Sequence, residues 1–261
     1  MDKVITDIDD LGVARVRLNN PDKHNAFDDQ MIGQLTEAFA AVAGNASVRV
    51  MVLASEGKSF SAGGDLGWMK RMASFSHEEN LRDAGALGLM LQTLNQIPQP
   101  TIARIQGQAF GGAVGLVSCC DMAVAASAAS FSLSEVKIGL IPATISPYVI
   151  AAIGQRAARR YFVTAERFDA HRALQIGLVS EVVDAEQLDQ EVDRLVDAVL
   201  GNGPEAVRAA KQLLFDVAGK PIDQQLISAT CETIASIRAS EQGQEGLQAF
   251  LEKRKPQWLK Q

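Results

Sequence analysis

The sequence predicts an α/β protein with a largely parallel β/α core followed by a helical C-terminal region. Short apolar, β-branched segments alternate with helical patterns through the first half of the chain, which is typical of a β/α core. From about Asp184 onward, almost only amphipathic helical patterns remain. A length of 261 residues suits one large domain with an appendage. We therefore expect a core over residues 1–184 and a helical region over residues 185–261.

The strands are predicted from short runs bounded by turn residues. The segment VARVRL (13–18) should pair with KVITDI (3–8) across an Asp-Leu-Gly turn. The run VRVMVLAS (48–55) has the β-branched, uninterrupted apolar character of a buried strand, and TIARI (101–105) is a further strand. These segments supply the framework of the expected sheet.

Two long helices are predicted between these strands. Residues 29–44 should form a helix with Asp28 as its N-cap, and its apolar face is expected to contain Met31, Leu35, Phe39 and Val42. A second helix should run from about Ser76 to Gln96, stopped near Pro98, with Leu87, Met90, Leu91 and Leu94 in its later turns.

Composition narrows the class of protein. Apolar residues make up 47% and charged residues 21%, which are ordinary values for a soluble globular protein. The net charge of −6 argues against a nucleic-acid partner. The acidic start MDKVITDIDD lacks a signal peptide's apolar core, and no run of about 18 apolar residues suggests a membrane span. Three cysteines without a C-x-x-C pattern indicate neither a metal site nor a redox pair, so we expect a cytoplasmic protein.

Two glycine-rich loops share one pattern. In VMVLASEGKSFSAGGDL (50–66) and in TIARIQGQAFGGAVGL (101–116), a strand ends in a loop with paired glycines and a helix then begins. Backbone N–H groups at a helix start have no partner within the helix, and glycine lets a ligand approach closely. Either loop alone is better explained as a turn or packing device. Together they could direct two N–H groups at one oxyanion.

Four segments resemble one family. GKSFSAGGDL, IQGQAFGGAVGL, SEVKIGLIP and AFLEKRKPQW occur in order over nearly the whole chain, and together they resemble the enoyl-CoA hydratase/isomerase (crotonase) family. The resemblance implies a crotonase-type β/α spiral of repeated ββα units with a helical C-terminal trimerisation region. It also implies a homotrimer or homohexamer, an acyl-CoA substrate, and no cofactor beyond the coenzyme A of that substrate.

The resemblance implies roles for particular residues. The N–H groups of Gly64 and Gly112 would bind the thioester oxygen, and the remaining residues would contact CoA or the acyl group. Those from the first half of the chain are Lys23, Ala26, Lys58, Ala62, Asp65, Leu66, Trp68 and Met69. Phe250 and Lys253 would reach towards CoA, often in a neighbouring subunit, although an exposed terminal helix explains them equally simply.

The acid–base residues depart from the family pattern. Hydratases of this family commonly use two glutamates, and the resemblance places the second at Glu135 in SEVKIGLIP. At the position of the first stands Gly115. A single carboxylate can take a proton from water and return one to Cα if both atoms lie within hydrogen-bond reach.

Gly115 also bears on the substrate. GLIPATISP and GAVGLVSCCDMAV carry a finer resemblance to bacterial hydratases of 3-methylglutaconyl-CoA (leucine catabolism) and of γ-carboxygeranoyl-CoA (acyclic terpene catabolism). We expect Gly115 to leave room for a β-methyl group and count it as a substrate-binding residue. The leading hypothesis is hydration of a β-branched, carboxylated enoyl-CoA. Alternatives are a Δ3,Δ2-enoyl-CoA isomerase using one glutamate, more general fatty acid metabolism, or a non-catalytic CoA- or RNA-binding relative.

Overall fold

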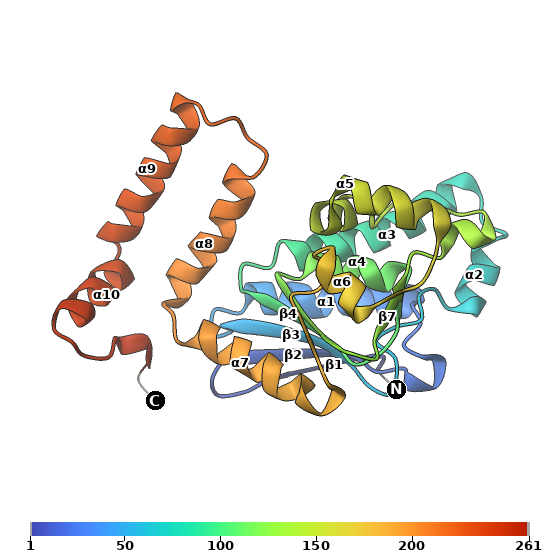
Figure 1. Ribbon diagram of the computed structural model, residues 1–261, viewed down its shortest axis with the longest axis horizontal. Coiled ribbons are helices and arrows are strands. Elements are labelled where there is room, and N and C mark those ends of the chain that lie inside the picture. The colour runs from blue at the N-terminus through green and yellow to red at the C-terminus, as the bar shows by residue number, and fades with distance from the viewer. Residues whose placement is uncertain (1, 260–261) are drawn as a thin grey trace.

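The computed structural model describes residues 2–259 and contains two β-sheets covered by helices (Figure 1). The larger sheet has the strand order β1-β2-β3-β4-β6-β9. Its strands are β1 (Val4–Ile8), β2 (Val13–Leu18), β3 (Val50–Ser55), β4 (Thr101–Ile105), β6 (Met122–Ala126) and β9 (Glu181–Val183). Only β1 and β2 pair antiparallel, and the others are parallel. The predicted β/α core with a parallel sheet is confirmed.

A smaller sheet lies beside the glycine-rich loops. Its order is β5-β7-β8, where β5 is Ala109–Phe110, β7 is Ser130–Ser132 and β8 is Phe168–Asp169. A parallel bridge between Ser61 and Ala109 joins the first glycine loop to β5. A second parallel bridge joins Phe27 to Gly64. The two loops predicted from the sequence are therefore neighbours in one backbone ladder.

Alternating side chains of the large sheet serve two separate cores. On β3, Met51 and Leu53 pack into the main core, whereas Val50 and Val52 face the other side, as the two-residue period of a strand requires. The main core lies under the helices α1 (Asp29–Gly44), α3 (His77–Asn95), α4 (Gly112–Cys119) and α5 (Ser146–Thr164). Figure 1 shows these helices on one side of the sheet and α7 (Leu188–Leu200) on the other.

The predicted helix ends agree closely with the structure. The Asp28 side chain accepts a hydrogen bond of 3.0 Å from the Met31 N–H and caps α1. Ser76 caps α3 through a reciprocal capping box with Glu79. Of the predicted core positions on α3, Leu87 is only partly buried, while Met90, Leu91 and Leu94 are fully buried.

The boundary expected at Asp184 does not divide the packing of the chain. Leu188, Val192 and Val196 of α7 form one apolar cluster with β-strand residues that include Val50 and Val52. Helix α7 therefore belongs to the core. The segment that stands beside the core begins with α8 (Pro204–Val217) and continues through α9 (Gln224–Ala239) and α10 (Glu241–Leu251), as Figure 1 shows in orange and red.

Two short helices complete the core. Helix α2 (Leu66–Met72) follows the first glycine loop directly, and α6 (Ala170–Gln175) follows β8. The sequence analysis predicted neither α6 nor α5 by its bounds. Among residues 2–259, no helix is long and apolar enough to cross a bilayer.

Candidate active site

The first glycine loop directs the N–H of Gly64 away from Phe27, its partner in the parallel bridge. The Phe27 N–H donates to the Gly63 carbonyl and the Asp65 N–H donates to the Phe27 carbonyl, both at 2.7 Å. In a parallel bridge of this kind the flanking residues make the bonds, so the N–H of the central residue points to the opposite side. Gly64 is exposed. Its N–H is therefore available to a ligand.

The second loop presents Gly112 as the first residue of α4. At this position an N–H has no acceptor within the helix. The preceding Gly111 has φ 54° and ψ −123°, a conformation that a residue with a Cβ rarely adopts, and its N–H donates to the Ser132 carbonyl at 2.9 Å. Ser132 on β7 thus holds the turn that exposes the Gly112 N–H.

Phe27 connects the two loops, which the sequence analysis did not foresee. Its backbone forms the bridge with Gly64, and its ring lies against Gly112, where an added Cβ would be 3.2 Å from the Phe27 Cε2 atom. The side chain is buried, with 2% of its surface exposed. One residue therefore contacts both glycines that the sequence predicts for the oxyanion site. An apolar residue after Ala26 looks like ordinary core in the sequence, so no local pattern could have indicated this contact.

Glu135 lies against the same turn. A Cβ added to Gly111 would be 3.2 Å from the Oε1 atom of Glu135, so a side chain at position 111 would crowd the carboxylate. The Oε2 atom is buried and makes no hydrogen bond within the described part of the chain. Burial raises the pKa of Glu135, because a desolvated carboxylate favours its neutral form. The carboxylate is thus a stronger base than an exposed glutamate, with one oxygen free for a substrate or water.

The space expected beside Gly115 is not present. A Cβ added to Gly115 would lie 2.3 Å from Cγ2 of Ile145 and 3.3 Å from a Leu91 methyl carbon. Both Ile145 and Gly115 are buried. The expectation that Gly115 leaves room for a β-methyl group is therefore wrong, because a branched side chain from the start of α5 fills that volume. Ile145 lies thirty positions after Gly115, and nothing in the sequence pattern indicated that its side chain would pack against that glycine.

The remaining residues predicted for the first half of a CoA site lie around the Gly64 loop. The Asp65 carboxylate caps α2 by accepting from the Trp68 N–H at 3.0 Å, and it accepts from the Lys23 ammonium at 2.8 Å. The hydrogen bond from Lys23 holds the pKa of Asp65 below its usual value. Lys23 thus organises the loop as well as offering a positive charge, since much of its side chain is exposed.

Other predicted contacts differ in exposure. Lys58 and Leu66 are exposed, Ala62 is half-buried, and Ala26 is buried. Met69 packs beside Gly64, where its Sδ atom is 3.4 Å from the position of an added Cβ. Trp68 is buried in the main core and donates from Nε1 to the Asp83 carboxylate at 2.9 Å, so α3 holds its ring.

Phe250 and Lys253 do not meet the other site residues within one chain. Both are exposed at the end of α10, which lies at the opposite end of the molecule from α2 (Figure 1). A contribution from these residues to the Glu135 site would therefore require a second subunit. No cluster of three or more histidine, cysteine or acidic side chains suited to a metal occurs in residues 2–259.

Comparisons with known proteins show the family of this chain. The model of the enoyl-CoA hydratase/isomerase family matches residues 9–261, and the chain belongs to that family. It is an enzyme with the crotonase fold.

Individual relatives are similar over nearly their whole length. Crotonyl-CoA hydratase of Syntrophomonas wolfei is 31% identical over 95% of this chain and 94% of its own. A solved enoyl-CoA hydratase from Shewanella pealeana is 47% identical, with a TM-score of 0.95 over 98% of this chain and 96% of that one. An enoyl-CoA hydratase from Mycobacterium smegmatis is 33% identical, with a TM-score of 0.93 over 99% of both chains.

Proposed function

We propose that this enzyme adds water to the double bond of an enoyl-CoA, with Glu135 as its only acid–base carboxylate. The observation that carries the proposal is the carboxylate of Glu135, whose Oε1 atom lies against the turn that presents the Gly112 N–H and whose buried Oε2 atom has no partner in the described chain. The similarity to proteins named as hydratases over nearly the full chain supports it.

The proposed reaction uses one proton cycle. Glu135 removes a proton from a water molecule while the oxygen of that water attacks Cβ. The electrons of the double bond move to Cα and the thioester oxygen. The N–H groups of Gly64 and Gly112 stabilise that enolate. Glu135 then returns the proton to Cα, which gives a 3-hydroxyacyl-CoA and restores the carboxylate. The raised pKa of Glu135 suits the first step, because it makes the carboxylate a stronger base, and the return of the proton is favoured because the enolate carbon is far more basic than a carboxylate.

Ile145 favours a second candidate reaction on the same atoms. The volume beside Gly115 holds an aliphatic side chain and no second carboxylate, so it offers no polar group to fix a water molecule. A lone Glu135 could instead move a proton between Cα and Cγ, which is Δ3,Δ2-enoyl-CoA isomerisation.

The proposal extends to the acyl group of the substrate. A β-branched, carboxylated acyl group such as that of 3-methylglutaconyl-CoA is supported by the motif resemblance alone, since the volume argument at Gly115 does not hold. Any distal carboxylate would need a cationic or amide partner, because an unpaired buried charge is costly.

A panel of four thioesters tests both questions: crotonyl-, 3-methylcrotonyl-, 3-methylglutaconyl- and a β,γ-enoyl-CoA. A hydratase removes the absorbance of the conjugated thioester, whereas an isomerase acting on the β,γ compound creates it. We expect loss of absorbance, with the highest kcat/KM for 3-methylglutaconyl-CoA. A tenfold or greater preference for crotonyl-CoA would replace the branched substrate with a linear one. A gain of absorbance alone would replace hydration with isomerisation.

A further inference from the structure

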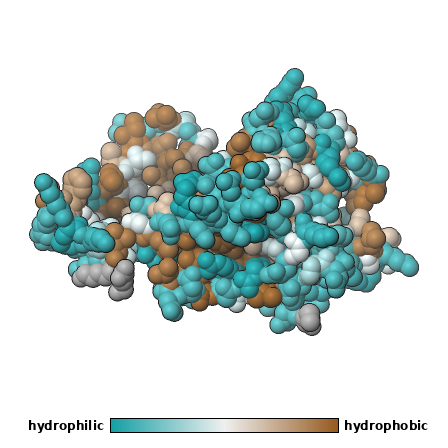
Figure 2. Space-filling model, turned by 60° about the horizontal axis from the view of Figure 1, so that its bottom comes forward, coloured by the Kyte–Doolittle hydropathy of each residue, from teal (hydrophilic) through white to brown (hydrophobic). Residues whose placement is uncertain are grey.

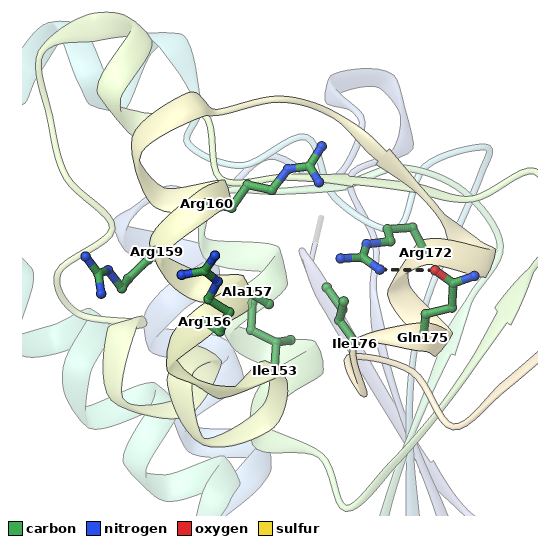
Figure 3. Close-up of a pocket in the computed structure, with 8 residues that line it drawn as sticks. All are labelled: Ile153, Arg156, Ala157, Arg159, Arg160, Arg172, Gln175 and Ile176. Carbon is green, nitrogen blue, oxygen red and sulfur yellow. Dashed lines mark hydrogen bonds between the residues drawn. The ribbon is translucent and has the colours of Figure 1, made fainter.

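A pocket rich in arginines lies between α5 and α6 (Figure 3). Its volume is about 680 Å³, within the range of small-molecule sites. None of its lining residues belongs to the site around Glu135. Four of the eight are arginines, and Ile153, Ala157 and Ile176 provide apolar surface between them.

The arginines differ in how far their charge is neutralised. Arg160 forms a two-pronged ion pair with Glu166, at 2.6 and 2.9 Å. Arg172 is held by neutral groups, since its Nε donates to the Tyr161 hydroxyl at 3.0 Å and its Nη1 donates to Gln175 at 3.1 Å. Its position is therefore fixed while its charge stays uncompensated by a direct ion pair. Arg156 and Arg159 form no ion pair or hydrogen bond with any described residue.

Figure 3 shows how these groups face the pocket. Arg160 from α5 and Arg172 from α6 extend from opposite sides into the space above Ile176, Arg156 lies on α5 to the left of Arg172, and Arg159 points away. One carboxylate already faces two of these arginines, because the pKa of Glu166 is lowered mainly by its hydrogen bond from Arg160 and also by the charge of Arg172. A further anion would be attracted by Arg156 and by the charge of Arg172 that no direct ion pair neutralises. This concentration of positive charge occurs in a chain whose net charge is −6.

The pocket's chemistry indicates the class of ligand. Planar guanidinium groups bind phosphate through paired N–H donors, more specifically than lysine does. The apolar surface of Ile153 and Ile176 would cover a non-polar part of the same molecule. We propose that this arginine pocket binds an organic phosphate, with Arg156, Arg160 and Arg172 on the phosphate and the isoleucines on its apolar group.

Calorimetric titration with phenyl phosphate and with inorganic phosphate tests the proposal, at an ionic strength held constant with chloride. We expect saturable binding of phenyl phosphate at one site per chain, tighter than that of inorganic phosphate. Arg156→Gln and Arg172→Gln should each weaken it about tenfold or more, the scale for losing a hydrogen bond to a charged group.

Arg238→Gln is the matched control. Arg238 is exposed on α9, and its substitution removes the same charge far from the pocket, so binding should be unchanged. Arg156→Gln also guards against misfolding, because the Arg156 side chain has no partner to lose. Equal affinities in all three variants, or no saturation with the wild-type protein, would overturn the proposal. Equal affinity for the two phosphates would overturn the role of the apolar surface.

Discussion

Glu135 has the surroundings of a base whose strength is set by burial. Its Oε2 atom has no partner in the described chain, and its pKa is raised. Glu135→Gln keeps the shape but removes the base, so we expect kcat to fall by about 100-fold or more while CoA binding persists. Glu135 must be ionised to act as a base, and its pKa is raised. As the pH is lowered, wild-type kcat/KM should therefore begin to fall at a higher pH than the pKa of an ordinary glutamate would predict. A pH–rate profile checks both effects, and near-wild-type turnover of the variant would eliminate Glu135 as the base.

Phe27 should influence catalysis without touching the reacting atoms. Its ring rests on Gly112 while its backbone bridges Gly64. In Phe27→Leu we expect kcat to fall by less than the about 10²–10³ typical of deleting a whole donor, with KM nearly unchanged. The absorption of a bound, conjugated acyl-CoA analogue reports polarisation of its carbonyl, and its red shift should shrink in the variant. A full red shift with normal kcat would show that Phe27 only packs the core.

Gly115 should be required for packing against Ile145. In Gly115→Ala the new methyl group would overlap Cγ2 of a stiff, β-branched side chain, and overpacking typically costs about 1–3 kcal/mol. We expect a loss of that size in urea unfolding. In a chain that already carries Ile145→Ala, adding Gly115→Ala should cost much less of the free energy of unfolding than it does in the wild-type chain. If the two substitutions were additive, direct contact would not be the cause.

At the scale of elements, Asp65 joins the first glycine loop to α2. Asp65→Ala should destabilise the protein by about 1 kcal/mol, since it removes a helix cap, whereas Asp65→Asn should keep the cap and lose only the charge facing Lys23.

The pH dependence separates these two contributions of Asp65. Its folded-state pKa is lowered, so the stability from its charge is present above the unfolded pKa and is lost as pH falls through the folded one. The stability gap between wild type and Asp65→Asn should therefore close in acid. Urea unfolding at neutral and acidic pH measures it, and a gap that is constant with pH would argue against the ion pair.

At the scale of the whole molecule, the C-terminal helices expose more apolar surface than a monomer needs. Among the exposed side chains on α8 to α10 are Leu214, Phe215, Ile227, Ile234, Leu247, Phe250 and Leu251. Figure 2 shows apolar surface gathered on this side of the molecule, at the left of the view. Patches of this kind commonly mark subunit contacts.

We therefore expect a homotrimer or homohexamer, in which Phe250 and Lys253 could reach a neighbour's site. Removing the chain from Gln242 onward should weaken both assembly and affinity for CoA. Light scattering and CoA titration of the truncated and full-length proteins measure this. A full-length protein that is monomeric and fully active would contradict the expectation.

What the sequence determined by itself is local. Caps such as Asp28, the apolar run of β3 and the paired glycines follow from the neighbours of each residue along the chain, so pattern alone predicted them. The ordered motifs likewise indicated the family and pointed to Glu135. Such features depend on backbone preferences and spacing, which a sequence states directly.

What only the tertiary structure decided is which distant residues share a volume. Ile145 fills the space beside Gly115, Phe27 couples Gly64 to Gly112, and α7 joins the core beyond the expected boundary. Each depends on how α5, the first glycine loop or the sheet packs, and a buried apolar residue in the sequence does not show which partner it will meet. Close packing leaves one side chain per space, so a vacancy inferred from one residue is filled or left open by another.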